Sequence, residues 1–346
     1  MQQERQPEAC VVCGGKSHHV VCSGRELRDQ EEFLRAFHSR RLKGAPDGTI
    51  PSAVLADRVQ FSQGYLTDVV ECDHCGLIFR YPRPADDEIT ARYAADHYDS
   101  DRLQAMHDLQ LANSRQRARN IERLLPHASI PTVVELGSFE GSFLCAGQER
   151  GWNISGIDPG EDVGKFCRAR GLRVYRGTVN DAELSPRSCD AVAIWNTFDQ
   201  LPDPVPTLSR IMGLLRPHGI LAVRIPNGAC FKLMVRLLRR PGAWRNDFLK
   251  RAMAWNNLLM FPYLYGYTRP GIDRLMAGYG LRPEAWQPDQ LVTLSDHQTK
   301  TWAAWEEGLI KVLCAMVYRT EQVFHRNDLA TAPWLDLYYR REPSAS

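Results

Sequence analysis

The chain has 346 residues, of which 44% are apolar, and its 43 basic and 41 acidic side chains leave a net charge of +2. This length allows two or three structural units, and the small net charge excludes a global field that would recruit nucleic acid or an anionic membrane. No stretch approaches the roughly 18 uninterrupted apolar residues of a membrane span, and the first residues lack the features of a signal peptide. We therefore expect a soluble, cytoplasmic protein with ten reduced cysteines.

Two Cys-x-x-Cys-Gly units stand in the first quarter of the chain. Two thiolates separated by two residues can grip one face of a tetrahedral Zn²⁺, and the following glycine allows a sharp turn. Four thiolates make a closed structural site, whereas a catalytic zinc keeps an open position. A disulfide framework is the weaker alternative, because no signal peptide is recognisable. The predicted zinc ligands are Cys10, Cys13, Cys72 and Cys75.

The two knuckles are separated by about 58 residues, where 15–20 would be usual for a compact ribbon. The excess contains a predicted helix over residues 26–42 and a loop over 44–48, which we interpret as an insertion within the ribbon. Residues 77–81 predict a strand, and an acidic first turn predicts a helix from 85 to about 98.

A long amphipathic helix is predicted over residues 102–125, and the stretch Thr132–Leu144 follows it. Val133 and Val134 indicate a buried strand that ends at Glu135, and Gly137 and Gly141 indicate a tight turn before a helix. Such a turn is where a nucleotide-like ligand lies in an α/β fold.

A second strand, residues 152–157, ends at Asp158, which is 17 residues after Gly141. An acid near this spacing holds ribose in dinucleotide and nucleoside folds, and its two oxygens suit two adjacent hydroxyls. The alternative role for Asp158 is a helix N-cap. Further strands at 172–175, 190–195 and 220–225, with a helix at 206–215, predict a parallel sheet wound on both faces.

These segments resemble the class I S-adenosylmethionine-dependent methyltransferases. The matching motifs are Glu135-Leu-Gly137-Ser-Phe-Glu-Gly141, Gly156-Ile-Asp158-Pro159, Phe198-Asp-Gln-Leu-Pro-Asp-Pro204 and Leu214-Leu-Arg-Pro-His-Gly219. With the cysteine pairs, the chain looks like the zinc-ribbon-bearing subgroup that includes sugar C-methyltransferases and natural-product or surface-glycan methyltransferases. The resemblance covers roughly residues 8–230. It departs from the common pattern at Phe139, where a glycine is usual, and at Gln200, where a histidine is common.

The resemblance implies roles for the matching residues. Gly137 and Gly141 let the backbone approach the methionine part of the cofactor, Asp158 holds the ribose hydroxyls, and Asn196 lies under the sulfonium. Glu135 orients the loop, Thr178 and Val179 flank the adenine, and Tyr98 closes over the amino-acid end. The implied cofactor-binding set is Tyr98, Glu135, Gly137, Ser138, Gly141, Asp158, Pro159, Thr178, Val179, Asn196 and Thr197.

The last third of the chain is predicted to complete the fold. Residues 229–267 indicate a helical substrate lid rich in aromatic and basic side chains, although such a stretch could also touch a membrane or nucleic acid. Residues 271–280 predict a helix, 281–286 a strand, and 334–341 a closing strand. Residues 302–318 predict an amphipathic helix whose apolar face carries Trp302, Trp305, Leu309, Val312, Leu313 and Met316.

The expected architecture is an α/β fold with a Rossmann-like, doubly wound sheet of seven strands, preceded by a zinc ribbon and carrying helical lid insertions. The expected division is 1–84 for the ribbon, 85–227 for the cofactor-binding core, and 228–346 for the lid and closing strands.

The predicted function is methyl transfer from S-adenosylmethionine to an oxygen or carbon of a small molecule, such as a sugar, glycan precursor or secondary metabolite. A hydroxyl acceptor would need a general base, for which His107, His297, Asp199 and Asp296 are candidates. An RNA methyltransferase is one alternative, but the chain lacks the Asn/Asp-Pro-Pro-aromatic motif of base-amino methyltransferases. A non-catalytic protein that binds the cofactor is another. The acceptor and the oligomeric state stay open.

Overall fold

The computed structural model describes residues 9–44, 67–83, 85, 88–89, 97–126, 129–291, 293–296, 298–324 and 330–343. The chain forms two compact units, each assembled from segments that are distant in the sequence. We name them the ribbon unit (Met1–Arg83, Pro226–Gly271 and Pro288–Leu335) and the Rossmann unit (Pro84–Ile225, Ile272–Gln287 and Asp336–Ser346). The three-segment division expected from the sequence stays a prediction.

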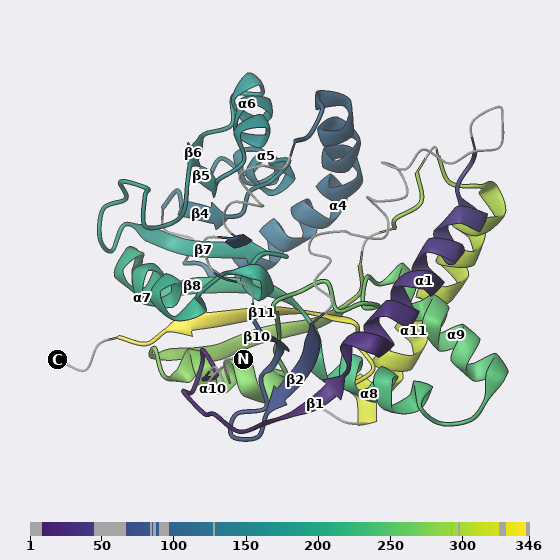
Figure 1. Cartoon of the computed structure of the whole chain (residues 1–346). Coiled ribbons are helices and arrows are strands. Elements are labelled where there is room, and N and C mark those ends of the chain that lie inside the picture. Colours follow the sequence, from purple (N-terminus) through teal and green to yellow (C-terminus); the bar gives the residue numbers. More distant parts are fainter. Residues whose placement is uncertain are drawn as a thin grey trace. The chain divides into compact units, whose positions relative to one another are not determined.

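The Rossmann unit is built on a seven-stranded sheet, as predicted, with the order β10-β11-β8-β7-β4-β5-β6 (Figure 1). Strand β4 pairs in parallel with β5 and β7, and the pairs β5–β6 and β7–β8 are also parallel. The central strands are buried, apolar and rich in β-branched residues, as strands covered on both faces require. The strands are β4 (Thr132–Leu136), β5 (Asn153–Asp158), β6 (Val174–Arg176), β7 (Cys189–Trp195), β8 (Leu215–Pro226), β10 (Leu281–Asp289) and β11 (Trp334–Arg341).

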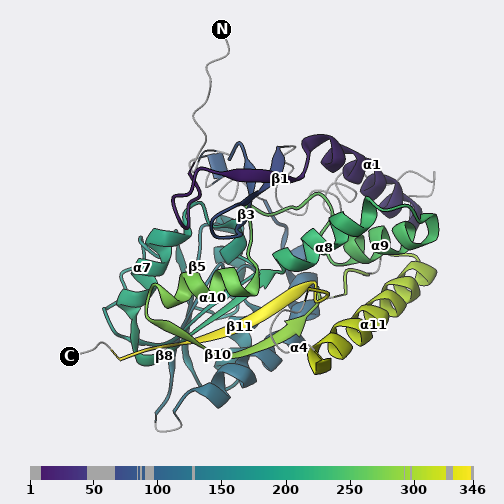
Figure 2. The ribbon, with the colours of Figure 1, turned by 90° about the horizontal axis from the view of Figure 1, so that it is seen from below.

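Helices cover both faces of this sheet. Helix α4 (Ser100–Leu124) packs on α5 (Ser142–Gln148) and α6 (Glu161–Ala169), and α7 (Pro204–Leu214) and α10 (Arg269–Ala277) lie on the opposite face (Figures 1 and 2). The side chain of Asp99 caps the N-terminus of α4 by accepting the N–H of Arg102. The helix predicted from residue 85 lies mostly outside the described residues. The loops that follow the C-terminal ends of β4, β5 and β7 contain most of the predicted cofactor-binding residues.

The ribbon unit contains a four-stranded antiparallel sheet in the order β1-β2-β3-β9. Its strands are β1 (His18–Cys22), β2 (Asp68–Cys72), β3 (Ile78–Tyr81) and β9 (Tyr265–Gly266). The second knuckle is the turn of the β2–β3 hairpin, and the predicted strand after it is confirmed. The predicted loop at 44–48 lies beyond residue 44, outside the described residues.

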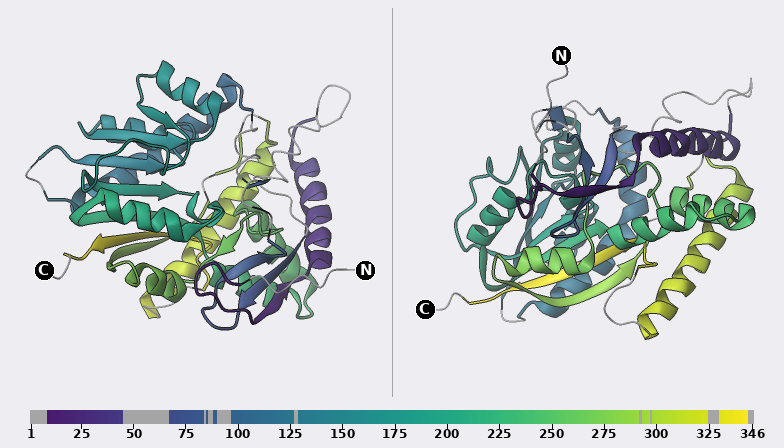
Figure 3. Two further views of the ribbon diagram at one scale, coloured as in Figure 1. Left: turned by 60° about the vertical axis from the view of Figure 1, so that its left-hand side comes forward. Right: turned by 60° about the horizontal axis from the view of Figure 1, so that its bottom comes forward.

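Four helices complete the ribbon unit: α1 (Gly24–Arg41), α8 (Gly228–Leu238), α9 (Ala243–Trp255) and α11 (Thr301–Phe324). The predicted insertion helix is α1, which begins with a capping box formed by Ser23 and Glu26. Helices α1, α9 and α11 pack together, and Glu306 of α11 accepts hydrogen bonds from Arg41 of α1 and Arg251 of α9 (Figure 3). The predicted helical character of residues 229–267 is confirmed by α8 and α9 up to Trp255, but residues 256–267 are not helical and include strand β9. The role of this segment as a lid stays a prediction.

Helix α11 orients its apolar face differently from the usual amphipathic helix. Such a face normally packs against the core, yet Trp302, Trp305, Leu309, Val312 and Met316 are all exposed. The side of α11 that faces the ribbon unit instead carries Ala303, Glu307, Ile310, Lys311 and Tyr318. The apolar periodicity therefore predicts the helix correctly, but it does not mark the side of the helix that packs.

None of the helices in the described parts of the chain combines the length and apolar character needed to cross a membrane.

Candidate cofactor site and cysteine cluster

The turn between β4 and α5 is built around two glycines in the left-handed region. Gly137 has a φ of 72° and Gly141 a φ of 70°, a conformation that costs side-chain-bearing residues energy. A Cβ at Gly137 would lie 2.2 Å from Oγ1 of Thr197, and one at Gly141 would lie 2.7 Å from Cδ1 of Leu172. Both positions therefore need glycine, and the turn packs directly against the loop that follows β7.

Asp158 connects this turn to the end of β5. Its Oδ2 accepts the backbone N–H of Phe139 at 2.9 Å, and its Oδ1 accepts the N–H of Gly160 at 2.8 Å. Burial raises the pKa of this carboxyl, and the two backbone N–H groups oppose that shift by stabilising the charged form. Helix α6 takes Gly160 as its N-cap, so the N-cap alternative for Asp158 is wrong.

Several buried oxygen atoms at the ends of β4 and β7 have no hydrogen-bond partner among the described residues, and neither does Nε1 of Trp195. The oxygen atoms are Oε2 of Glu135, Oγ of Ser138, Oδ1 of Asn196 and both carboxylate oxygens of Asp199. Because an unsatisfied buried polar group costs free energy, a concentration of them marks a place where a ligand supplies the missing bonds. Most of these atoms are acceptors, which suits a ligand with ammonium and hydroxyl donors.

The first-motif loop also holds two buried carboxyls whose pKa values are raised. For Glu135 the largest cause of the raised pKa is burial, followed by repulsion from Glu140 and Asp158. For Glu140 the cause is again burial, opposed by the hydrogen bond from Ser142. Sequence reasoning did not single out Glu140 and Ser142; the signal for them was their place in the glycine turn at the start of α5.

The four catalytic candidates have different surroundings. Asp296 lies in a turn, where its Oδ1 accepts the N–H of Gln298 and the hydroxyl of Thr299. His107 is buried, and its Nδ1 lies 2.9 Å from the carbonyl oxygen of Glu140. Asp199 is fully buried in the short helix η1 (Phe198–Gln200). Burial raises its pKa to about 7, and its own backbone N–H, the Gln200 side chain and the charge of Arg224 oppose this shift. His297 lies outside the described residues.

The other predicted cofactor residues lie around the same strand ends. Thr178 follows β6, and both its N–H and its hydroxyl donate to Asp181 at 2.7 Å. Val179 is buried, and Pro159 directly follows Asp158. The ring of Tyr98 meets that of Phe139 edge-on, with centroids 5.0 Å apart. Asn196 directly follows β7 with a φ of 54°, and the hydroxyl of the next residue, Thr197, donates to the carbonyl of Trp195.

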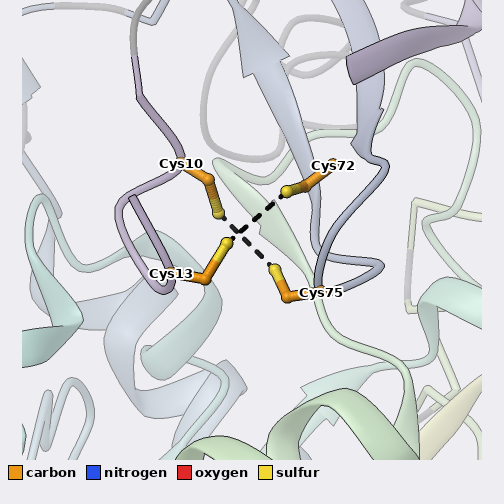
Figure 4. Close-up of side chains that lie close together, drawn as sticks. All are labelled: Cys10, Cys13, Cys72 and Cys75. Atoms are coloured by element: carbon orange, nitrogen blue, oxygen red, sulfur yellow. Dashed lines mark hydrogen bonds between the residues drawn. The ribbon is translucent and has the colours of Figure 1, made fainter. Parts of the chain in front are cut away.

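In the ribbon unit, the two knuckles bring four thiols together (Figure 4). The sulfurs of Cys10, Cys13, Cys72 and Cys75 all lie within 4.8 Å of one another, and no disulfide joins them. Cys10 Sγ lies 3.6 Å from Cys75 Sγ, and Cys13 Sγ lies 3.6 Å from Cys72 Sγ. Tetrahedral zinc with bonds of about 2.3 Å would separate its sulfurs by about 3.8 Å. The cluster therefore has the donor type, number and spacing of a closed zinc site.

Comparison with known families and structures places this geometry in context. A family model described as a methyltransferase domain matches residues 107–285. No curated protein matches the chain at a significant level.

Similar solved structures include a 1,6-didemethyltoxoflavin-N1-methyltransferase from Burkholderia thailandensis, with 12% identity, a TM-score of 0.45, and coverage of 78% of this chain and 98% of that one. A chain from the Haloferax volcanii complex of the Trm112 activator and a methyltransferase has 16% identity, a TM-score of 0.44, and coverage of 75% and 100%. Geranyl diphosphate C-methyltransferase from Streptomyces coelicolor A3(2) has 16% identity, a TM-score of 0.42, and coverage of 72% and 87%.

Proposed function

The chain belongs to the methyltransferase-domain family and is an S-adenosylmethionine-dependent methyltransferase, and from that premise we propose that it methylates an oxygen or carbon of a small molecule. The acceptor class is a sugar, a glycan precursor or a secondary metabolite. The sequence supports this choice, because β7 leads into Asn196-Thr-Phe-Asp without the paired prolines of base-amino methyltransferases. The net charge of +2 also gives little general affinity for phosphate backbones.

The observation that carries the cofactor assignment is the set of unsatisfied buried oxygens of Glu135, Ser138 and Asn196 at the ends of β4 and β7. When bound, S-adenosylmethionine supplies an activated methyl group, so the protein mainly has to hold donor and acceptor in line and exclude water. Glu135, Ser138 and Asn196 would hold its donor groups, and Asp158 would take the ribose hydroxyls. Each Asp158 oxygen makes one backbone hydrogen bond and can accept another.

For a hydroxyl acceptor, we propose Asp199 as the general base. Among the described residues its carboxylate oxygens have no hydrogen-bond partner, whereas Nδ1 of His107 is already within hydrogen-bond distance of a backbone carbonyl. A pKa of about 7 keeps a useful fraction of the carboxylate ionised near neutral pH while leaving it basic enough to take a proton. The hydroxyl proton would pass to Asp199 while the methyl group moves from the donor sulfur to the acceptor oxygen. The acceptor would then be a neutral methyl ether.

Labelled methyl transfer tests the acceptor class and the base together. The full chain is incubated with methyl-labelled S-adenosylmethionine, sugar nucleotides and small hydroxylated metabolites, and separately with total RNA. We expect label in the small-molecule fraction, with Asp199→Asn lowering the rate by about 10²–10⁴-fold at unchanged cofactor affinity. The exposed acid Glu183, changed to Gln, is the control.

Label recovered in RNA would support the rival acceptor class, and cofactor binding without transfer to any tested class would support a non-catalytic role. A full transfer rate in Asp199→Asn would remove the base assignment while leaving the methyltransferase assignment intact.

We also propose that Cys10, Cys13, Cys72 and Cys75 hold one structural Zn²⁺, which would join the N-terminal loop to the β2–β3 hairpin. Metal analysis of the purified chain should find about one zinc per chain, and Cys72→Ser should lose it together with thermal stability. Cys314→Ser, which changes a thiol outside the cluster, should keep the metal. Folded, metal-free wild-type protein would contradict the site.

A further inference from the structure

The exposed side of α11 carries an apolar seam with a strict heptad spacing. Its members, separated alternately by three and four residues, are Trp302, Trp305, Leu309, Val312, Met316 and Val323, with Arg319 completing the pattern between the last two. The six apolar side chains are between 51% and 77% exposed. Such spacing over three heptads is typical of a helix that pairs with another helix through one narrow stripe.

This seam is not needed to hold α11 in the ribbon unit, because the opposite side of the helix is already anchored. Both carboxylate oxygens of Glu307 accept backbone N–H groups, from Leu294 at 2.6 Å and Ser295 at 2.8 Å. Lys311 pairs with Glu307 at 2.7 Å and donates to the carbonyl of Leu291 at 2.8 Å. Trp302 also contacts α1, because the guanidinium carbon of Arg41 lies 5.4 Å from its ring, but all six apolar side chains of the seam stay at least half exposed.

The area of the seam matches what a stable pair of chains requires. Taking up to about 250 Å² for a fully exposed tryptophan and less for the smaller side chains, the five seam residues from Trp302 to Met316 expose on the order of 600 Å², to which Arg319 adds. One partner contributes about 800 Å² to a standard protein–protein interface. Gly308 and Ala315 lie beside the seam, and their small size would let the backbone of a second helix approach closely.

The single charge in the seam indicates the orientation of the second helix. In a parallel pair Arg319 would face its own copy, which places like charges together inside the interface. In an antiparallel pair with Leu309 opposite Val312, Trp305 meets Met316 and Trp302 meets Arg319. Those contacts are a sulfur–aromatic pair and a cation–π pair, both of which are favourable.

We propose that this protein self-associates through an antiparallel, two-fold pairing of α11 with α11 of a second copy. The register places Leu309 of each copy against Val312 of the other, so each dimer contains two Trp302–Arg319 pairs. This inference rests only on α11 and does not depend on the acceptor or the cofactor of the methyltransferase.

Sedimentation equilibrium on the full chain, with its metal, tests the proposal. Interfaces of this area span micromolar to picomolar dissociation constants, so the wild type should be dimeric at about 50 μM. Leu309→Glu would bury a charge in the seam and should raise the dissociation constant at least tenfold. The matched control is Ile130→Glu, which changes another exposed aliphatic residue, 70% exposed, outside α11; it should leave the dimer unchanged.

Arg319→Gln decides the orientation. Removing both cation–π pairs should raise the dissociation constant several-fold in the antiparallel dimer, whereas relief of charge repulsion would lower it in a parallel one. A wild type that is monomeric at these concentrations, an unchanged Leu309→Glu dimer, or a tighter Arg319→Gln dimer would each overturn the proposal. A monomer that co-floats with phosphatidylcholine vesicles, and loses this binding in Leu309→Glu, would also overturn the proposal. The seam would then bind a lipid surface.

Discussion

The carboxylate of Asp158 accepts the backbone N–H of Phe139 at 2.9 Å, and this bond joins the end of β5 to the turn between β4 and α5. Phe139 stands where the resemblance to class I methyltransferases implies a glycine, and it adopts a φ of 39°, which is unfavourable for a residue with a side chain. The charge-assisted bond from Asp158 and the ring contact with Tyr98 stabilise that conformation. Asp158 is therefore predicted to serve two purposes: shaping the turn and accepting the cofactor's ribose hydroxyls.

The first prediction concerns this double role. Asp158→Ala should weaken S-adenosylmethionine binding, measured by calorimetry, by about 1.5–3 kcal/mol, the range for hydrogen bonds to a charged acceptor. It should also lower the free energy of unfolding without ligand, because the N–H of Phe139 loses its partner. Glu161→Ala, which removes an exposed acid three residues further on, is the control. Unchanged affinity in Asp158→Ala would remove its ribose role.

The second prediction concerns the close approach of the glycine turn to the loop after β7. Gly137→Ala should destabilise the protein and weaken cofactor binding, because its Cβ would lie 2.2 Å from Oγ1 of Thr197. Gly151 has a nearly identical φ of 74° but no atom within 4 Å of an added Cβ. Gly151→Ala should therefore show only the cost of a left-handed alanine, about 1–2 kcal/mol. Urea unfolding of both variants separates the clash from the backbone strain, and equal losses would argue against the clash.

Much of the Rossmann unit could be predicted from the sequence because its signals are local. The apolar run around Val133 and Val134, followed by Gly137, fixed both the strand and the turn, and the alternation with helices indicated the parallel sheet. The four-cysteine cluster could also be predicted from the sequence, because the Cys-x-x-Cys-Gly spacing by itself places two thiols on the same side of a turn. These features need no knowledge of distant contacts.

Features that depend on contacts between residues distant in the sequence could not be predicted from local patterns. The pairing of the two-residue strand β9 with β3 joins residues almost two hundred positions apart, and no local pattern marks it. Heptad spacing predicted α11 as a helix, but periodicity alone does not state which side packs inward. The buried, unsatisfied state of Asp199 likewise follows from three-dimensional packing, so the sequence offered the residue only as one candidate among several.

The third prediction concerns the pH dependence that Asp199 imposes. Its pKa rises from 3.8 in the unfolded chain to about 7 in the fold, so between these values the folded state binds the extra proton. Its contribution to stability is therefore fully present below about pH 4, falls by about 1.4 kcal/mol per pH unit, and is lost above about pH 7. Asp199→Asn should lack this slope and should exceed the wild type in stability at pH 8.

The measurement for Asp199 is the difference in unfolding free energy between wild type and variant from pH 4 to pH 8. Asp181 is a control of opposite sign, because hydrogen bonds from Thr178 lower its pKa. The contribution of Asp181 to stability is present above its pKa in the unfolded chain and is lost as the pH falls through its pKa in the folded chain. Asp181→Asn should therefore not reproduce the Asp199 profile. Parallel profiles for wild type and Asp199→Asn would show that Asp199 does not titrate in this range.

The last prediction concerns a buried ion network in the Rossmann unit. Asp336 on β11 accepts hydrogen bonds from Arg117 of α4 at 3.2 Å and from Arg224 of β8 at 2.8 Å, and all three side chains are buried. Asp336→Ala would leave two buried guanidinium groups without their carboxylate and should lower the unfolding free energy by about 3–5 kcal/mol in urea titrations. Glu149→Ala breaks an exposed pair, in which Arg115 donates two hydrogen bonds to Glu149 and the side chains of Arg115 and Glu149 are 50% and 39% exposed. This change should cost less than about 1 kcal/mol. Because both variants remove one carboxylate from an arginine pair, comparable losses would show that burial does not set the strength of the Asp336 network.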